Sequence, residues 1–323
     1  MKKESRFLAI IQKRFVMMSI LFIVLLVAFA FLSGGVSLKT RNLVNILNSM
    51  ALSAFLTEGV ALLMISGRLD LSTGANGTLC GLFLAFVLRA GMPLLPAILI
   101  TLCIGVVIGI LNAILVNEVQ MAPFIATLAT SLIATGFVYL IANKKTIDIV
   151  NTTIKAYGKH MIFGYIPVSA LLAFSLMAII GIILHKTQFG RQIYIVGGNP
   201  QAAMLAGVNP KKMSYILFAV CGFFSSIAGI TFVARMQSAN MQGLSAQRFQ
   251  GITAAVLGGI SFGGGSGGMG SAFVGLLVLT TFSNGMTVMG VSPYWQNVAS
   301  GLLLIFALTL DYLQKQQALK TVA

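Results

Sequence analysis

The feature that most constrains this chain is a series of long apolar segments joined by short polar links. A helix that crosses the hydrocarbon core of a membrane needs about 20 mostly apolar residues. Segments 72–90 and 249–262 are short or interrupted by Gly, Ser and Thr, so we expect them to pack inside the bundle instead of facing lipid. The sequence predicts about ten transmembrane helices, at 15–34, 43–66, 72–90, 93–116, 122–142, 164–185, 213–234, 249–262, 270–289 and 294–313.

Composition leads to the same fold class. Hydrophobic residues make up 58% of the 323 residues and charged residues only 8%, whereas a soluble domain has about 25% charged residues. We therefore expect an all-α membrane protein, a polytopic helix bundle. The formal net charge of +15 is explained by the excess of Lys and Arg at the inner face of membranes and by their attraction to anionic lipid, so it does not call for nucleic acid as a partner.

The basic start MKKESRFLAIIQKRF sets the predicted orientation. A secretory signal peptide is the alternative, but no small-residue cleavage site followed by a polar mature domain is present. Positive residues beside the first span favour an inner N-terminus, and an even number of spans then places the C-terminus inside, although the lysines of the predicted outer loop 143–163 oppose this. The predicted parts are a cytoplasmic tail at 1–14, a transmembrane domain at 15–313 with a cytoplasmic loop at 186–212, and a cytoplasmic tail at 314–323.

A glycine fingerprint in LGGISFGGGSGG raises the possibility of nucleotide binding. Gly263, Gly265 and Gly268 have the G-x-G-x-x-G spacing, but that motif needs a strand before it and an acidic residue about 20 positions later. The next acid is Asp311, and no G-x-x-x-x-G-K-[ST] sequence occurs. We therefore expect the chain to bind no cofactor and to have no catalytic residue. The cysteines lie in predicted spans without metal-ligand spacing, so we also expect no metal site.

Charged residues inside the membrane are costly and therefore informative. Glu58 lies in the second predicted span, and Arg68 and Asp70 follow in SGRLDLSTG, where glycines interrupt the apolar run. This break is either an interfacial turn that meets headgroups and water, or a structural element at the inner end of a translocation pathway.

The predicted inner loop 186–212 contains the second informative segment, NPQAAMLAGVNP. Asn199 as cap, Pro200 at the first helical position and Gly207 at the end predict a short helix. The helix either lies on the membrane surface or is a docking element that presents Met204 and Leu205 to a soluble partner.

These segments resemble motifs of the ribose/xylose/galactoside-type sugar permeases of bacterial ABC importers. SGRLDLSTG resembles the family's TGGIDLSVG, FGRQIYIVGGNPQAAMLAGV resembles GR-x-x-YAIGGNP-x-AA-x-LSGI, and AAVLGGISFGGGSGG resembles AAVVLGGTSLxGGxGS. The final segment NGMTVMGVSPYWQNVASGLLLIFALTLD resembles the family's terminal pair of spans. The likeness covers roughly 43–313 in the family's order. The motif positions are Gly67, Asp70, Ser72, Gly74, Gly258, Gly259, Gly264 and Gly265.

The resemblance implies a bacterial inner-membrane permease that pairs with a second copy, or with a paralogous permease, around a central pathway. A cytoplasmic ATPase that binds ATP and Mg would drive it, and an extracytoplasmic sugar-binding protein would deliver substrate. The inner loop would provide the coupling helix for the ATPase. By position, that role falls on Gly197, Gly198, Asn199, Pro200, Ala202, Ala203 and Gly207.

Two segments depart from the family pattern. Arg68 adds a positive charge beside Asp70, and Arg248, Phe249 and Gln250 stand where many relatives have the acidic triplet E-L-D. These departures bear on the substrate and leave the implied mechanism unchanged.

The predicted function is import of a monosaccharide, ribose-like or related, by the membrane subunit of an ATP-driven transporter. The alternatives are a nucleoside or a furanosyl signalling molecule as cargo, an ion-driven secondary carrier, and a membrane scaffold. An uncharged sugar needs hydrogen-bonding and aromatic groups along its route. The candidates in the predicted spans are Asn45, Asn48, Phe124, Thr127, Thr130, Ser131, Phe282 and Asn284.

Overall fold

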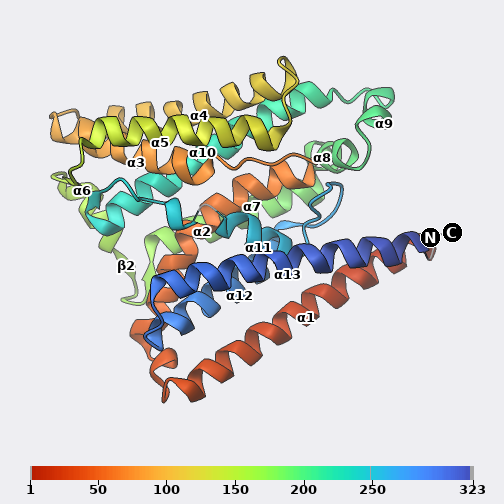
Figure 1. Cartoon of the computed structure of the whole chain (residues 1–323), viewed down its shortest axis with the longest axis horizontal. Helices are drawn as coiled ribbons and strands as arrows, with labels where there is room; N and C mark the ends of the chain where they lie inside the picture. Colours follow the sequence, from red (N-terminus) through yellow and green to blue (C-terminus); the bar gives the residue numbers. More distant parts are fainter. Residues whose placement is uncertain (1, 248, 321–323) are drawn as a thin grey trace.

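The computed structural model describes residues 2–247 and 249–320, and the helices form an elongated bundle (Figure 1). Among these residues, seven helices are long and apolar enough to cross a membrane, as the sequence predicted for those segments. They are α1 (Lys2–Leu32), α2 (Thr40–Ile65), α4 (Leu94–Asn117), α5 (Pro123–Ala142), α7 (Val168–Lys186), α10 (Pro210–Met236) and α12 (Met269–Val288).

The other three predicted spans are helices of different kinds. Segment 72–90 is α3 (Thr73–Arg89), an apolar helix of 17 residues, and segment 249–262 contains only the nine-residue α11 (Gln250–Gly258). Both are almost entirely buried, so the prediction that they pack inside the bundle is confirmed. Segment 294–313 lies in α13 (Pro293–Lys320). The predicted tail residues 2–14 continue α1 as helix.

The two ends of the bundle differ in what they carry. At one end α1 begins and α13 ends, α8 (Gln188–Gly198) packs on α7 and α2, and α9 (Pro200–Leu205) projects from the bundle (Figure 1). We call this the α9 end. The α6 end, opposite, carries α6 (Thr152–Lys159), the turn η1 (Val36–Leu38) and two short antiparallel pairs. These pairs are β1 (Ile147–Asp148) with β4 (Ser238–Ala239), and β2 (Met161–Ile162) with β3 (Ile166–Pro167).

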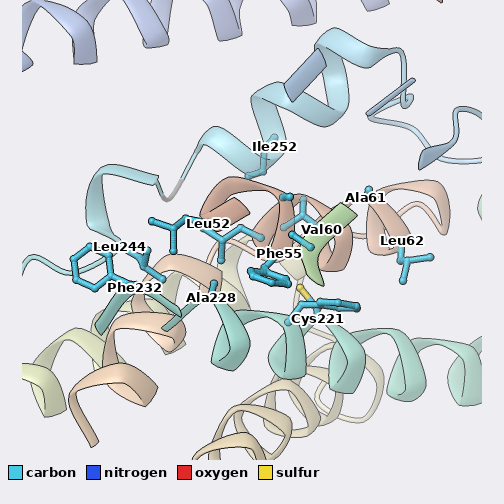
Figure 2. Close-up of a cluster of buried hydrophobic side chains, with 14 of the residues drawn as sticks. Leu52, Phe55, Val60, Ala61, Leu62, Cys221, Ala228, Phe232, Leu244 and Ile252 are labelled. Atoms are coloured by element: carbon cyan, nitrogen blue, oxygen red, sulfur yellow. The ribbon is translucent and has the colours of Figure 1, made fainter. Parts of the chain in front are cut away.

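Helix α2 forms the centre of the bundle. Every residue from Met50 to Ile65 is buried, and α2 packs against α7, α10, α11 and α12. Figure 2 shows Phe55 of α2 beside Cys221 and Ala228 of α10, while Ile252 of α11 lies on the other side of α2. A helix that carries hydroxyl and carboxyl groups as well as apolar ones is placed at the centre because its polar groups would be costly against lipid.

Helices α3, α4 and α10 meet along a seam of small residues. A Cβ added to Gly222 of α10 would collide with the Gly105 carbonyl of α4, and one added to Gly229 would collide with the Gly77 carbonyl of α3. Small residues let membrane helices approach closely enough for extensive van der Waals contact. We call this region the packed seam.

Residues 237–247 return into the bundle after α10 instead of staying at its α6 end. The Leu244 N–H donates to Thr78 Oγ1 in the interior of α3, 2.9 Å away, and the turn η2 (Ser245–Gln247) leads into α11. Helix α11 begins beside Ser53, near the middle of α2, and covers the remaining distance to the α9 end. The eighth predicted span, 249–262, is therefore the half-length helix α11, preceded by a re-entrant segment at 237–247.

Candidate functional site

A polar cavity of about 600 Å³ opens between α2, α12 and the re-entrant segment. Carboxamide and hydroxyl side chains supply most of its polar surface, and Arg235 is the charged residue among the described lining residues. We call it the first cavity. It is lined by Asn42, Asn45, Ser49, Leu52, Ser53, Arg235, Met236, Gln247, Gln250, Leu279, Thr280, Ser283, Asn284, Thr287, Val288 and Gln296.

Hydrogen bonds hold several of these groups in place. Asn42 and Asn284 exchange side-chain hydrogen bonds, with Asn42 Nδ2 donating to Asn284 Oδ1 at 2.8 Å and Asn284 Nδ2 donating to Asn42 Oδ1 at 3.1 Å. Ser53 Oγ donates to Gln250 Oε1 at 2.8 Å, and Gln296 Nε2 donates to the Val291 carbonyl at 2.9 Å. The cavity therefore presents uncharged donors and acceptors at fixed positions.

A second cavity, of about 870 Å³, lies between the re-entrant segment, α11 and α13. The polar groups among its described lining residues are uncharged, and two exposed aromatic residues, Phe249 and Tyr294, also line it. It is lined by Gln242, Ser245, Phe249, Gln250, Thr253, Leu279, Pro293, Tyr294, Asn297, Ser300, Gly301 and Leu304.

The predicted pathway residues do not form one group. Asn45 and Asn284 line the first cavity, whereas Asn48 does not line either cavity. Phe282 packs edge-on against Phe29 of α1, with ring centroids 6.3 Å apart. The remaining four lie on α5, which packs against α3 and α4. These are Phe124, Thr127, Thr130 and Ser131.

The Thr127 side chain is hydrogen-bonded to the backbone of the loop between α2 and α3. Its Oγ1 donates to the Pro123 carbonyl at 2.8 Å and accepts from the Leu71 N–H at 3.1 Å. Thr130 Oγ1 donates to the Thr127 carbonyl, Ser131 is buried, and Phe124 is 53% exposed on the surface of the bundle.

Sequence reasoning missed most of the lining of the first cavity, although two spacings indicate it. Asn42, Asn45, Ser49 and Ser53 recur three or four residues apart on α2, a spacing that places side chains on one helix face. The polar residues that α12 contributes to the lining have the same three- or four-residue spacing. These are Thr280, Ser283, Asn284 and Thr287.

The break between α2 and α3 is held by a buried carboxylate. Asp70 is 1% exposed, and its Oδ1 accepts from the Ser72 N–H at 2.7 Å and from Ser72 Oγ at 2.6 Å. Asn112 Nδ2 donates to Asp70 Oδ2 at 3.3 Å and to Ser72 Oγ at 2.9 Å. The interpretation that Asp70 meets headgroups and water is wrong. Arg68 is partly exposed, and Gly74 is buried in α3.

The predicted glycine motifs converge at the α9 end of the bundle. Gly67, Gly264 and Gly265 have φ of +78°, +82° and +73°, a region that favours glycine. The Gly265 N–H donates to the Ile65 carbonyl at 2.8 Å, and a Cβ on Gly264 would lie 2.8 Å from Gly67 Cα and 2.7 Å from the Gly197 carbonyl. Three chain segments, after α2, at the end of α8 and after α11, therefore meet here backbone to backbone. We call this the glycine junction.

Two further motif glycines, Gly258 and Gly259, lie beside the junction at the end of α11. Gly259 ends α11 with φ of +102°, and Gly258 packs against the backbone of Ser271 in α12. The side chain of Tyr194 in α8 donates to the Gly267 carbonyl at 2.7 Å, and burial raises the pKa of this phenol above its ordinary value. The turn between α11 and α12 is thus held against α8.

The predicted short helix of loop 186–212 is present as α9. Asn199 Oδ1 accepts from the Gln201 and Ala202 N–H groups at 3.0 Å each, and Gly207 follows with φ of +78°. The preceding helix α8 was not predicted.

The two alanines of the predicted coupling set face opposite ways. Ala202 is exposed and Ala203 is fully buried. Met204 and Leu205 are 58% and 91% exposed, as the docking interpretation requires. Gly198 has open space around its Cα.

Comparison with known proteins gives the family. The model described as "branched-chain amino acid transport system / permease component" matches residues 42–308. The chain belongs to this permease family. It is 32% identical to the ribose import permease protein RbsC of Bacillus subtilis over 85% of both chains. It is 31% identical to the galactose/methyl galactoside import permease protein MglC of Salmonella typhimurium, over 91% of this chain and 94% of that one.

A further relative is a probable ABC transporter permease protein of Sinorhizobium fredii, 29% identical over 85% of this chain and 83% of its own length. No solved structure matches the chain. The permease is a multi-pass inner-membrane protein, and its relatives are transport subunits and not enzymes.

One acidic residue of the permease is left without a partner. Glu58 of α2 is fully buried, and neither carboxylate oxygen has a hydrogen-bond partner within the described parts of the chain. The described residues also contain no group of three or more His, Cys, Asp or Glu that would hold a metal ion. Arg248, one of the departures from the family pattern, lies outside the described residues.

Proposed function

We propose that the permease is the membrane-spanning subunit of an ATP-driven importer and that it passes a monosaccharide. The supporting observation is the first cavity, whose fixed carboxamide and hydroxyl groups match the donors and acceptors of a sugar and whose described lining residues include no acid. The relatives named for ribose and galactose point to the same class of cargo.

The proposal includes an orientation and a set of partners. The chain crosses the membrane ten times, and the α9 end is cytoplasmic, with both termini, because positive residues flank the first span on that side. An ATPase subunit binds ATP and Mg and receives α9, and an extracytoplasmic binding protein delivers the sugar to the α6 end. A second permease copy, or a paralogous permease, completes the pathway. Reporter fusions after Lys145 and after Gln201 test the orientation and should read outside and inside respectively. The opposite readings would overturn it.

The cargo is tested by uptake into cells that lack their own systems for the compounds used. The permease is expressed together with its cognate ATPase and binding protein, and labelled ribose, galactose, adenosine and leucine are supplied in parallel. We expect uptake of at least one monosaccharide and none when the ATPase is omitted. Uptake of leucine or adenosine alone would overturn the sugar proposal, and uptake without the ATPase would show an ion-driven carrier.

The coupling role of α9 is tested at its exposed alanine. Ala202→Trp adds bulk to the exposed surface, so the permease should reach the membrane folded while transport and co-purification of the ATPase are lost. A helix lying on lipid headgroups would instead accept this tryptophan, because Trp is favoured at the interface. Ala203→Trp tests folding, because Ala203 is fully buried. Normal transport and normal ATPase retention in Ala202→Trp would move the docking site elsewhere.

A further inference from the structure

The two polar cavities of the permease are adjacent, and few side chains separate them. Two residues, Gln250 and Leu279, line both cavities. Gln250 is the first residue of α11, and Leu279 belongs to α12. A solute that moves from one cavity to the other therefore passes one carboxamide side chain and one leucine.

The two residues of this partition are held differently. Leu279 is 1% exposed and is fixed by packing within α12. Gln250 is partly exposed and is restrained by one hydrogen bond, in which Ser53 Oγ donates to its Oε1 at 2.8 Å. The backbone beneath Gln250 is fixed, because Gly251 lies so close to α2 that an added Cβ would be 3.1 Å from the Leu56 carbonyl carbon. The movable part of the partition is therefore the Gln250 side chain.

The second cavity has the surface that a sugar requires. Its hydroxyl and carboxamide groups, among them Thr253, Asn297 and Ser300, are donors and acceptors of the kind that pair with sugar hydroxyls. The rings of Phe249 and Tyr294 offer flat apolar surfaces to the C–H faces of a sugar ring. It is also larger than the first cavity, at about 870 Å³ against about 600 Å³. Apart from Arg235 in the first cavity, the described polar groups of both cavities are uncharged, and Gln250 belongs to both.

We propose that Gln250 is the specificity-determining residue of the pathway, acting as a movable partition between the two cavities. Passage requires the Ser53–Gln250 hydrogen bond to break. The released carboxamide, which is both donor and acceptor, then bonds to a hydroxyl of the passing sugar, so a solute that lacks a hydroxyl at that position leaves the carboxamide unpaired. This inference rests on the proposed function, because it assumes that the cargo is a sugar.

The test compares uptake of several monosaccharides by the wild-type permease and three variants. Gln250→Leu keeps the side-chain volume and removes the hydrogen bonds, so we expect uptake of the best sugar to fall by roughly tenfold. Gln250→Asn keeps the carboxamide on a shorter side chain and should retain more uptake than Gln250→Leu. Ser53→Ala removes the hydrogen bond that a passing sugar must replace. Poor sugars then no longer have to break it, so the ratio of uptake between the best and poorest sugars should fall.

Thr135→Val provides the matched control. It exchanges a polar for an apolar group of equal shape in α5, away from both cavities, and should leave uptake unchanged. Membrane levels and gel-filtration profiles show that each variant is folded. If folded Gln250→Leu carries every sugar at the wild-type rate and Ser53→Ala keeps the wild-type ratio, the inference is overturned. If the wild-type permease carries no sugar, the proposed function itself fails, which is a separate outcome.

Discussion

The packed seam and the side of the molecule that carries the cavities contain the same types of small and polar residue. In the seam these residues bring helices into close contact, whereas on the cavity side they line open volume. In the seam, Gly105 and Gly222 bring α4 and α10 together, and Ser226 is buried with its hydroxyl bonded to the Gly222 carbonyl at 3.0 Å. On the cavity side, Ser283 and Thr287 of α12 line an open volume. Gly, Ser, Thr and Asn therefore do not by themselves distinguish a tight helix contact from a pathway.

The difference follows from what lies opposite each residue. In the seam, a glycine of one helix faces the backbone of the next, and no volume is left. On the cavity side, α11 is only nine residues long, so the re-entrant segment and α13 do not close against α2 and α12. The seam therefore acts as a rigid support, while substitutions on the cavity side affect passage more than folding. The predictions below test this division.

The largest expected effect is on the seam. Gly222→Val places a side chain against the Gly105 carbonyl, and because backbone on both helices would have to shift, we expect a loss of about 3 kcal/mol or more of stability. Little folded protein should survive solubilisation, as measured by gel filtration and thermal unfolding in detergent. Gly136→Val in α5 is the matched control, since a Cβ there meets nothing within 4 Å. Equal profiles for the two variants would show that the seam is not rigid.

A bulky side chain in the first cavity should block transport and leave the fold intact. Ser283→Phe fills part of a volume of about 600 Å³, so we expect uptake to fall at least about tenfold, equivalent to about 1.4 kcal/mol. The melting temperature in detergent should stay close to that of the wild type. Gly136→Phe provides the control for an added phenyl ring at an open position on α5. Wild-type uptake by Ser283→Phe would exclude the first cavity from the route.

The glycine junction connects the two regions at the α9 end. The neighbouring residues Gly197 and Gly198 allow its close packing to be tested, because they differ in the space around them. Gly197→Ala brings a methyl group against the Ile65 carbonyl and the Gly265 N–H, whereas the same methyl group at Gly198 has open space. We expect Gly197→Ala to lose about 1–3 kcal/mol of stability together with part of its uptake, and Gly198→Ala to behave as the wild type. Thermal unfolding and uptake measured on both variants make the comparison. Identical behaviour would mean that α8 is not seated on the junction.

The smallest expected effect concerns an exposed ion pair on the seam side. Lys211 Nζ lies 3.1 Å from Glu118 Oε2, and the hydrogen bond and charge of Lys211 lower the pKa of Glu118 below its ordinary value. A lowered pKa contributes stability above the ordinary glutamate pKa of about 4.3, and this contribution is lost as the pH falls through the lowered value. Surface pairs contribute little, so Lys211→Ala should lower the melting temperature slightly at pH 7 and not at pH 3. An equal decrease at both pH values would contradict this.

Local patterns were sufficient for several parts of the fold. The apolar runs predicted the bounds of six of the seven membrane-length helices within a few residues, and of α1 only the apolar part from Phe15, because its helix already begins at Lys2. Asn199, Pro200 and Gly207 predicted α9 from capping chemistry alone. The glycines of LGGISFGGGSGG form a turn with positive φ at Gly264, Gly265 and Gly267. Helix α8 was missed because it lies in a predicted inner loop, where its 11 residues are too few to resemble a span.

The sequence by itself determined that the chain is a membrane bundle of this family, because hydropathy, caps and glycine turns depend on residues that are neighbours in the chain. Tertiary structure alone decided which polar residues face a cavity. Asn45 and Asn284 line the first cavity, while Thr127, an equally polar candidate, bonds the loop before α3. Tertiary structure also decided that, of the two neighbouring alanines of α9, Ala203 is buried and Ala202 is exposed. The physical reason is that a side chain's environment depends on the helix opposite it, and that helix comes from a distant part of the chain.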